Sequence, residues 1–190
     1  MVDDISGGMP AVITHLYDPR RGPFRNICNL SDEEAERILD EIRNSGRPSL
    51  KPNYLSRRRK TETWLLSERC RKQGRPYLDH PVYFFLGDRS DWRHASRPAS
   101  VVLPLKLFPE DALTFTFPDS MASLPLSVEE KHLADRKDHH GKVFALAEIS
   151  TDMPCGRDPH DTFVEVQVWD DRPLRALVKS LPGIIDVHDI

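Results

Sequence analysis

The stretch that most constrains the fold is Thr162-Phe163-Val164-Glu165-Val166-Gln167-Val168-Trp169, because its alternation of residue types predicts a β-strand with two different faces. The valines form one β-branched face that is suited to a core. Glu165 and Gln167 share the other face with two aromatic rings, an arrangement that fits a pocket for a flat polar ligand. The alternative interpretation is the solvated face of an ordinary antiparallel sheet.

The length and charge of the chain limit its organisation. A chain of 190 residues can form one domain with a substantial core, and no break in composition divides it. We therefore predict a loose N-terminal segment at 1–10 followed by a single domain at 11–190. The net charge of -3 gives no general attraction to nucleic acid, so any such contact would need a local basic patch.

The cysteines and the apolar segments bear on the compartment. Cys28, Cys70 and Cys155 are too far apart in the sequence to indicate a disulfide framework or a paired-cysteine zinc site, so buried free thiols are expected. The N-terminus lacks the apolar run of a signal peptide, and no stretch has the length of a membrane span. We expect a protein of the reducing cytoplasm that does not bind a membrane.

Short strands outnumber helices in the predicted secondary structure. Strands are predicted at 11–17, 82–86, 100–105, 113–117, 143–149, 162–169 and 184–187. Ser31 and Glu34 form a capping box that begins one helix, and Gly46 ends it. Ser56 is predicted to cap a second helix, with further short helices from Ser127 to Gly141 and from 173 to 178. This order predicts the α+β class: a single domain with a mostly antiparallel split sheet and helices mainly in the N-terminal half.

Several polar segments have both a functional and an ordinary interpretation. The second helix should bury Thr61, Trp64, Leu65 and Cys70, while its run 57–60, Arg-Arg-Arg-Lys, either contacts phosphates or is a solvated helix face. The segment 89–98 is either a substrate loop or a surface loop. The residues His132, Asp135, Asp138, His139 and His140 fit no standard zinc spacing, and we interpret them as a solvated cluster.

Four short motifs, taken in order, resemble the ADP-ribosyltransferase fold, and more narrowly the DNA-modifying ADP-ribosyltransferase toxins of bacterial toxin–antitoxin systems. These motifs are Thr14-His15, Pro81-Val82-Tyr83-Phe84-Phe85, the segment from Leu113 to Ala122, and Val164-Glu165-Val166-Gln167-Val168 ahead of Pro173-Leu174. The resemblance implies NAD as substrate, a nucleic acid or protein as acceptor, and an antitoxin as partner. It implies Glu165 as the catalytic residue, His15 as a residue that holds NAD, and Tyr83 as the ring that packs on nicotinamide. Many members of that family carry Gln or Glu two residues before the catalytic Glu, whereas this chain has Phe163 there.

The chemistry of NAD cleavage fits these residues. Breaking the nicotinamide–ribose bond builds positive oxocarbenium character on the sugar, which the Glu165 carboxylate would stabilise, or it would activate the acceptor. Arg58 is the first candidate for the pyrophosphate, ahead of Arg89, because a helix would hold it more rigidly. We expect His15 to face Glu165 and Tyr83 across one pocket, with Tyr17 beside it as a further part of the cofactor site. A core histidine bonded to its own backbone neighbours is the alternative for His15.

Two other functions fit the same sequence. Pro118-Asp119 followed by Glu165-x-Gln167 is similar to the Pro-Asp…(Asp/Glu)-x-Lys pattern of metal-dependent nucleases, with Gln167 in place of the lysine. In that function Asp119 and Glu165 would bind a divalent metal, whereas the transferase requires none. The third candidate is a non-catalytic binding module.

Overall fold

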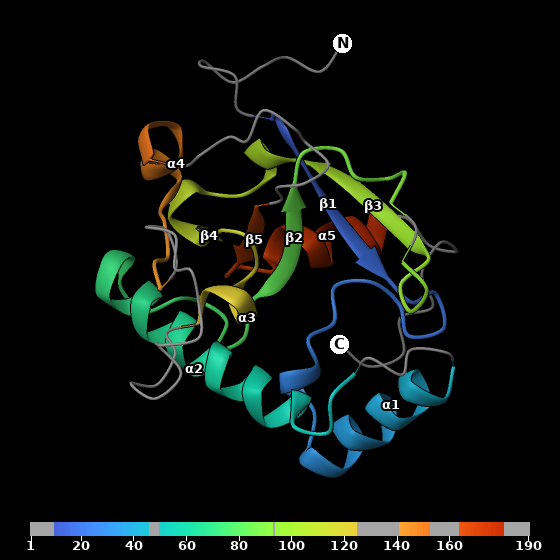
Figure 1. The fold of residues 1–190 in the computed structure, drawn as a ribbon. Coiled ribbons are helices and arrows are strands. Elements are labelled where there is room, and N and C mark those ends of the chain that lie inside the picture. The colour runs from blue at the N-terminus through green and yellow to red at the C-terminus, as the bar shows by residue number, and fades with distance from the viewer. Residues whose placement is uncertain (1–9, 46–49, 93, 125–140, 153–163, 181–190) are drawn as a thin grey trace.

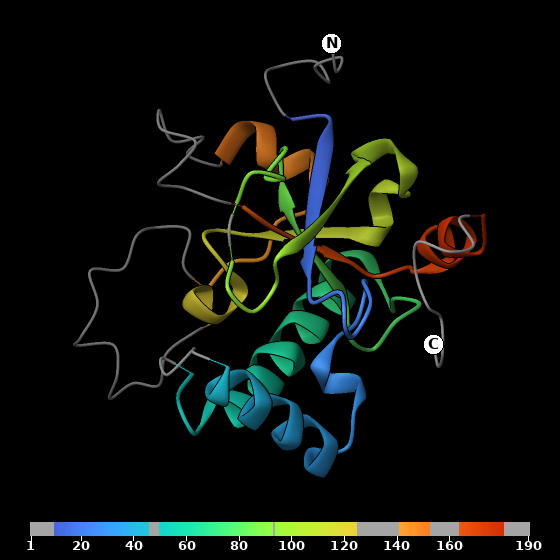
Figure 2. The same cartoon turned by 90° about the vertical axis from the view of Figure 1, so that its right-hand side faces the viewer.

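A computed structural model describes residues 10–45, 50–92, 94–124, 141–152 and 164–180, and these residues form an antiparallel sheet with helices on both faces (Figures 1 and 2). The strands are β1 (Val12–Tyr17), β2 (Val82–Leu86), β3 (Ala99–Pro104), β4 (Leu113–Thr116) and β5 (Glu165–Val168). Their order in the sheet is β3-β1-β2-β5-β4. The predicted α+β class is confirmed, with the two longest described helices in the N-terminal half of the chain.

The pairing between β1 and β2 is the shortest of the four strand pairings in the sheet. Strand β1 pairs along its whole length with β3, from Val12↔Pro104 to Tyr17↔Ala99. With β2 it registers only at Ile13↔Leu86 and Thr14↔Phe85. The two strands therefore diverge after Thr14, and the sheet opens on that side.

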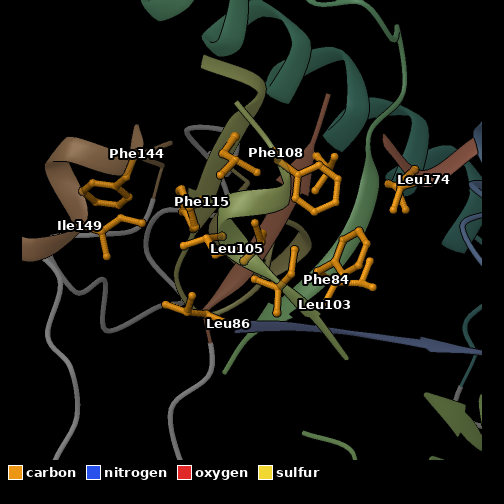
Figure 3. Packing of buried hydrophobic residues seen from close by; sticks show 14 of the residues in the cluster. Phe84, Leu86, Leu103, Leu105, Phe108, Phe115, Phe144, Ile149 and Leu174 are labelled. Carbon is orange, nitrogen blue, oxygen red and sulfur yellow. The ribbon is translucent and has the colours of Figure 1, made fainter. Parts of the chain in front are cut away.

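One face of the sheet carries the main core. Val166 and Val168 of β5 are fully buried there, as the sequence predicts, together with aromatic and aliphatic residues of the other strands. Figure 3 shows this cluster, with Phe84, Phe108 and Phe115 at its centre. Leu174 of α5 (Arg172–Ser180) closes it from one side. Leu105 of the short 3₁₀ turn η2 (Leu105–Leu107), Phe144 and Ile149 also belong to it, and a second turn, η3 (Glu110–Ala112), leads into β4.

The predicted strand at 143–149 is wrong. Phe144 makes a single bridge to Phe115, and the helix α4 (Leu146–Asp152) begins two residues later. The Glu148 carboxylate accepts a hydrogen bond of 2.7 Å from the N–H of Ala145, the residue that precedes the helix. This local cap favours a helix over a strand.

The helices α1 (Asp32–Asn44) and α2 (Tyr54–Gln73) lie together beneath the strands (Figure 1). The capping box of Ser31 and Glu34 is confirmed, since each side chain bonds to the backbone N–H of the other residue. The predicted start of α2 is wrong, because Asn53 precedes its first residue and Ser56 lies inside the helix. Cys70 is exposed on α2 rather than buried. None of the described helices is both long enough and apolar enough to cross a membrane.

The second face of the sheet is covered by α2. Leu65 of α2 packs against Trp169 and Val143 in a separate cluster. The short helix α3 (Ser120–Ser123) follows β4 and contacts α2. Several predictions fall outside the described residues: those for Gly46, Cys155, Phe163, the histidine cluster at 132–140 and the strand at 184–187. Most of the helix predicted to begin at Ser127 also lies there.

Candidate functional site

The Glu165 carboxylate is the centre of the candidate site. It begins β5 on the face covered by α2 and is only 8% exposed. Its Oε1 accepts hydrogen bonds of 3.1 Å from the Ser120 N–H and from Gln167 Nε2, while Oε2 accepts none from the described residues. Burial raises the pKa of Glu165, although Arg58 and these two hydrogen bonds act in the opposite direction. The carboxylate is thus held by one oxygen, with the other available to a ligand.

Gln167 fixes the orientation of Glu165. Besides its bond to Glu165, Nε2 donates to Thr116 Oγ1 at 2.9 Å, and Oε1 accepts from Thr114 Oγ1 at 3.0 Å. Trp169 Nε1 donates in turn to Thr114 Oγ1 at 2.7 Å, and both Gln167 and Trp169 are fully buried. The predicted pocket between aromatic rings is therefore wrong on the Trp169 side, where the face is closed core.

Arg58 approaches Glu165 from α2. Its Nη1 lies 3.4 Å from Ser120 Oγ, the residue whose N–H holds Glu165. Its guanidinium carbon stands 3.9 Å above the centre of the Tyr83 ring. Burial alone would lower the pKa of Arg58, but Tyr83, Glu62 and Glu165 together raise it above its ordinary value. Arg58 is therefore a permanent buried cation beside the carboxylate.

Only Lys60 of the basic run 57–60 is an exposed residue, and the three arginines are buried or partly buried. Arg58 is 8% exposed, Arg57 donates to the Met121 carbonyl at 2.8 Å, and Arg59 donates to the Leu30 carbonyl at 3.0 Å. These side chains join α2 to the segments around it. Only Arg58 of the three also lies beside Glu165.

Glu62, one turn after Arg58 on α2, is the ion-pair partner of Arg58. It is 1% exposed, and its Oε1 lies 3.3 Å from Arg58 Nε. The same oxygen accepts from the Tyr83 hydroxyl at 2.7 Å and from Asn26 Nδ2 at 3.0 Å. Burial opposes ionisation, but the hydrogen bonds and Arg58 keep the pKa of Glu62 below its ordinary value. Its position directly after Thr61 and one turn before Leu65, both on the inward stripe, was the available signal.

His15 does not face Glu165 and Tyr83 as expected. The registers put His15 on the core face with Phe84, and Glu165 on the opposite face with Phe85 and Tyr83. Both ring nitrogens are used by backbone groups: Nδ1 lies 2.7 Å from the Tyr83 carbonyl, and Nε2 accepts from the Phe24 N–H at 2.9 Å. Burial lowers the pKa of His15 from 6.5 to about 4, so the ring is neutral.

The role of His15 is accordingly structural. Its bond to the Tyr83 carbonyl joins β1 to β2 where their backbone pairing has ended. Tyr17 shares its face, as predicted, with the two rings stacked at 6.0 Å. Of the predicted site residues, the structure brings Arg58, Tyr83 and Glu165 together, whereas His15 and Tyr17 lie on the other side of the sheet.

A cavity of about 1110 Å³ extends to both faces of the sheet, at the side where β1 and β2 are not paired. Glu165, Arg58 and Tyr83 line it, and so do His15 and Tyr17. Two further lining residues, Phe85 and Trp92, have their rings 5.1 Å apart. Phe85 pairs with Glu165 in the sheet, and Arg89 stands 4.9 Å above the Trp92 ring. The polar loop after β2 therefore contributes an aromatic wall beside the carboxylate, a feature that the sequence indicated only in general terms.

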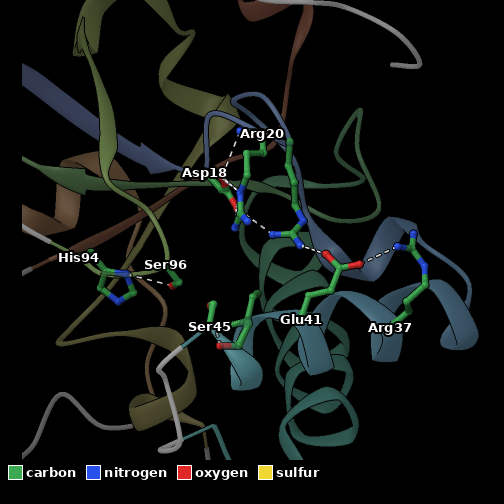
Figure 4. Close-up of polar contacts among 9 residues, drawn as sticks. Asp18, Arg20, Arg37, Glu41, Ser45, His94 and Ser96 are labelled. Carbon is green, nitrogen blue, oxygen red and sulfur yellow. Dashed lines mark hydrogen bonds and ion pairs between the residues drawn. The ribbon is translucent and has the colours of Figure 1, made fainter.

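Ion pairs connect the segment after β1 to α1 (Figure 4). Arg21 binds Asp18 at 2.8 Å and also binds Glu41 of α1, which Arg37 holds from its other side at 2.8 Å. Hydrogen bonding to Arg20 keeps the pKa of Asp18 low. In the loop between β2 and β3, His94 Nδ1 lies 3.2 Å from Ser96 Oγ. The end of β1 is thus tied to α1.

Asp119, the second carboxylate of the nuclease alternative, has a structural partner. Its Oδ1 accepts from the Ala122 N–H at 2.8 Å and caps α3.

Comparison of the chain with protein-family models, with curated proteins and with solved structures gives no match. The function is therefore argued from the geometry of the site.

Proposed function

We propose that the protein transfers ADP-ribose from NAD to an acceptor, with Glu165 as the catalytic carboxylate. The observation that carries the proposal is a buried carboxylate, held at one oxygen, beside a buried arginine at a large cavity. Such a pair combines a site for developing positive charge with a site for a phosphate anion.

Glu165 would act on the ribose that bears nicotinamide. When the bond between ribose and nicotinamide breaks, its electron pair leaves with nicotinamide and the sugar gains oxocarbenium character. The negative carboxylate would stabilise that charge, and it would then accept the proton of the attacking acceptor group. Because burial raises the pKa of Glu165, the reaction should slow at acid pH as this carboxylate becomes protonated.

Arg58 would hold the pyrophosphate. Its Nη2 makes no hydrogen bond to the described residues, whereas Nε and Nη1 are directed by Glu62 and Ser120. A guanidinium fixed in this way loses little entropy when it binds a phosphate. The aromatic wall of Phe85 and Trp92 beside Glu165 would pack on a flat ring of the substrate. Tyr83 has Arg58 over its ring, so its role would be to position that cation.

Calorimetric titration tests the substrate class. We expect NAD to bind the wild-type protein, and Arg58→Ala to weaken binding about 10- to 100-fold, as for a lost charge-assisted hydrogen bond. Arg71→Ala is the matched control, because Arg71 is an exposed arginine of the same helix that pairs with Glu68. Its affinity for NAD should equal that of the wild type.

The same titration separates the alternatives. Binding of Mg²⁺ or Mn²⁺ that is lost in Asp119→Asn and Glu165→Gln, with no affinity for NAD, would favour the nuclease. Absence of binding by NAD and by both metals would favour the non-catalytic module. Either result would reject the transferase.

A further inference from the structure

A second group of polar side chains lies around Glu62, the carboxylate that accepts from the Tyr83 hydroxyl, and its members come from three separate elements. Cys28 comes from η1 (Ile27–Asn29), Glu62 from α2, and His80 from the turn before β2. One donor atom of each, the thiol sulfur, a carboxylate oxygen and a ring nitrogen, lies within 4.8 Å of the other two. Cys28 and Glu62 are buried and His80 is partly buried.

We propose that Cys28, Glu62 and His80 bind a single divalent ion of the zinc type. A thiolate, an imidazole and a carboxylate together are a donor set that zinc accepts and that magnesium and calcium disfavour. Three protein ligands leave a fourth tetrahedral position for a water molecule.

The distances suit such an ion. His80 Nδ1 and Glu62 Oε2 lie 3.4 Å apart, at the limit for a hydrogen bond. Two ligands that are each about 2.1 Å from a tetrahedral zinc ion lie about 3.4 Å from one another. The Cys28 sulfur lies within 4.8 Å of the other two donor atoms, and it would need to approach them by at most about 1.2 Å, because a zinc-bound sulfur lies about 3.6 Å from a neighbouring oxygen or nitrogen ligand.

Glu62 is already oriented for this role. Its Oε1 receives Tyr83, Asn26 and Arg58, whereas Oε2 faces His80. An outer set of hydrogen bonds that directs one oxygen toward a metal is a regular feature of metal sites. The ion would thus fix the carboxylate that positions Tyr83 and Arg58.

Charge balance supports the assignment. In the described residues around Tyr83, one buried cation, Arg58, stands beside two buried carboxylates, Glu62 and Glu165. A zinc ion and a Cys28 thiolate together add one positive charge, which brings this buried group to neutrality. Burying charged groups is costly unless their charges are compensated.

Cobalt(II) titration of untagged protein tests the site. Cys70→Ser/Cys155→Ser leaves Cys28 as the only cysteine of the chain. We expect one equivalent of cobalt to give tetrahedral d–d bands and a thiolate-to-cobalt charge-transfer band, both of which zinc abolishes by displacement. Adding Cys28→Ser to this background should remove the charge-transfer band, and His80→Ala should weaken zinc binding about 100-fold or more.

The folded double variant provides the result that would overturn the proposal without relying on a ligand substitution. If this variant shows no charge-transfer band at saturating cobalt, whether or not cobalt binds, then Cys28 is not a metal ligand and the proposed site is rejected. His94→Ala is the matched control for His80→Ala, since His94 lies on the loop after β2 and outside this cluster. Equal loss of zinc in both histidine variants would also reject it.

Discussion

At the scale of single residues, Glu165 and Gln167 show how one strand face serves both packing and chemistry. Both lie on the face that the alternation predicts to be polar, yet only Glu165 reaches the cavity. Gln167 is fully buried, and its amide makes hydrogen bonds to Glu165, Thr114 and Thr116. The sequence identified the two residues but could not assign their roles, because the hydroxyls that engage Gln167 come from β4.

Gln167→Met should change both stability and the pH profile. The substitution keeps volume but leaves the buried Thr114 O–H without its acceptor and Thr116 Oγ1 without its donor, which should cost about 1–3 kcal/mol of unfolding free energy. It also removes a hydrogen bond that lowers the pKa of Glu165, so the acid limb of the rate profile should move to higher pH. Urea unfolding and nicotinamide release at several pH values measure the two effects.

Thr61→Val controls for the loss of stability alone. Thr61 is equally buried, but its hydroxyl bonds to the Arg57 carbonyl within α2. This variant should lose stability with an unshifted acid limb. If Gln167→Met left the acid limb in place as well, Gln167 would be no more than a packing residue.

His15 should make the fold sensitive to acid. Its folded pKa of about 4 lies below the ordinary 6.5, so the unfolded chain takes up the proton first as pH falls. The stability contributed by the neutral ring is complete above pH 6.5 and is lost down to about pH 4, with a total of about 3 kcal/mol. His15→Gln, which can keep both backbone bonds, should remove this part of the pH dependence in urea unfolding. An unchanged slope between these pH values would show that His15 does not titrate as its burial requires.

At the scale of elements, the sequence predicted those helices that begin with a capping residue and those strands whose residues alternate between two faces. The capping box at Ser31 and the valine face of β5 are both where the sequence puts them. The helix α2 was harder, because its basic residues resemble a solvated face. Arg58 is buried only because Tyr83 and Glu62 provide a ring and a carboxylate, and no local pattern reveals those partners.

Ser31→Ala tests the predicted cap. It removes the hydroxyl that accepts from the Glu34 N–H, so the free energy of unfolding should fall by about 1 kcal/mol. The box is exposed and does not line the cavity, so NAD affinity should remain unchanged. Ser45→Ala, at the other end of α1, is the control and should cost less, since the Ser45 hydroxyl donates to a carbonyl within the helix. Equal costs would mean that the capping box contributes no specific stability.

At the scale of the whole molecule, the position of the site depends on the sheet order and on the short β1–β2 pairing. The order β3-β1-β2-β5-β4 separates His15 from Glu165 by one strand and one face. The α+β class could be predicted from the order of local patterns, whereas strand order and register depend on contacts between distant segments. His15 therefore does not face Glu165 and Tyr83 as expected, and the residue that joins these two is Arg58, although the cavity is also lined by His15.

The release of nicotinamide from NAD, followed by mass spectrometry in the presence of nucleic acid and protein acceptors, tests the central claim most directly. The wild-type protein should release nicotinamide, and Glu165→Gln should do so at least about 100-fold more slowly, because the variant keeps the shape of the side chain and loses its charge. Circular dichroism and urea unfolding verify that the variant is folded. Equal release by the two folded proteins, or none by the wild type, would contradict the account.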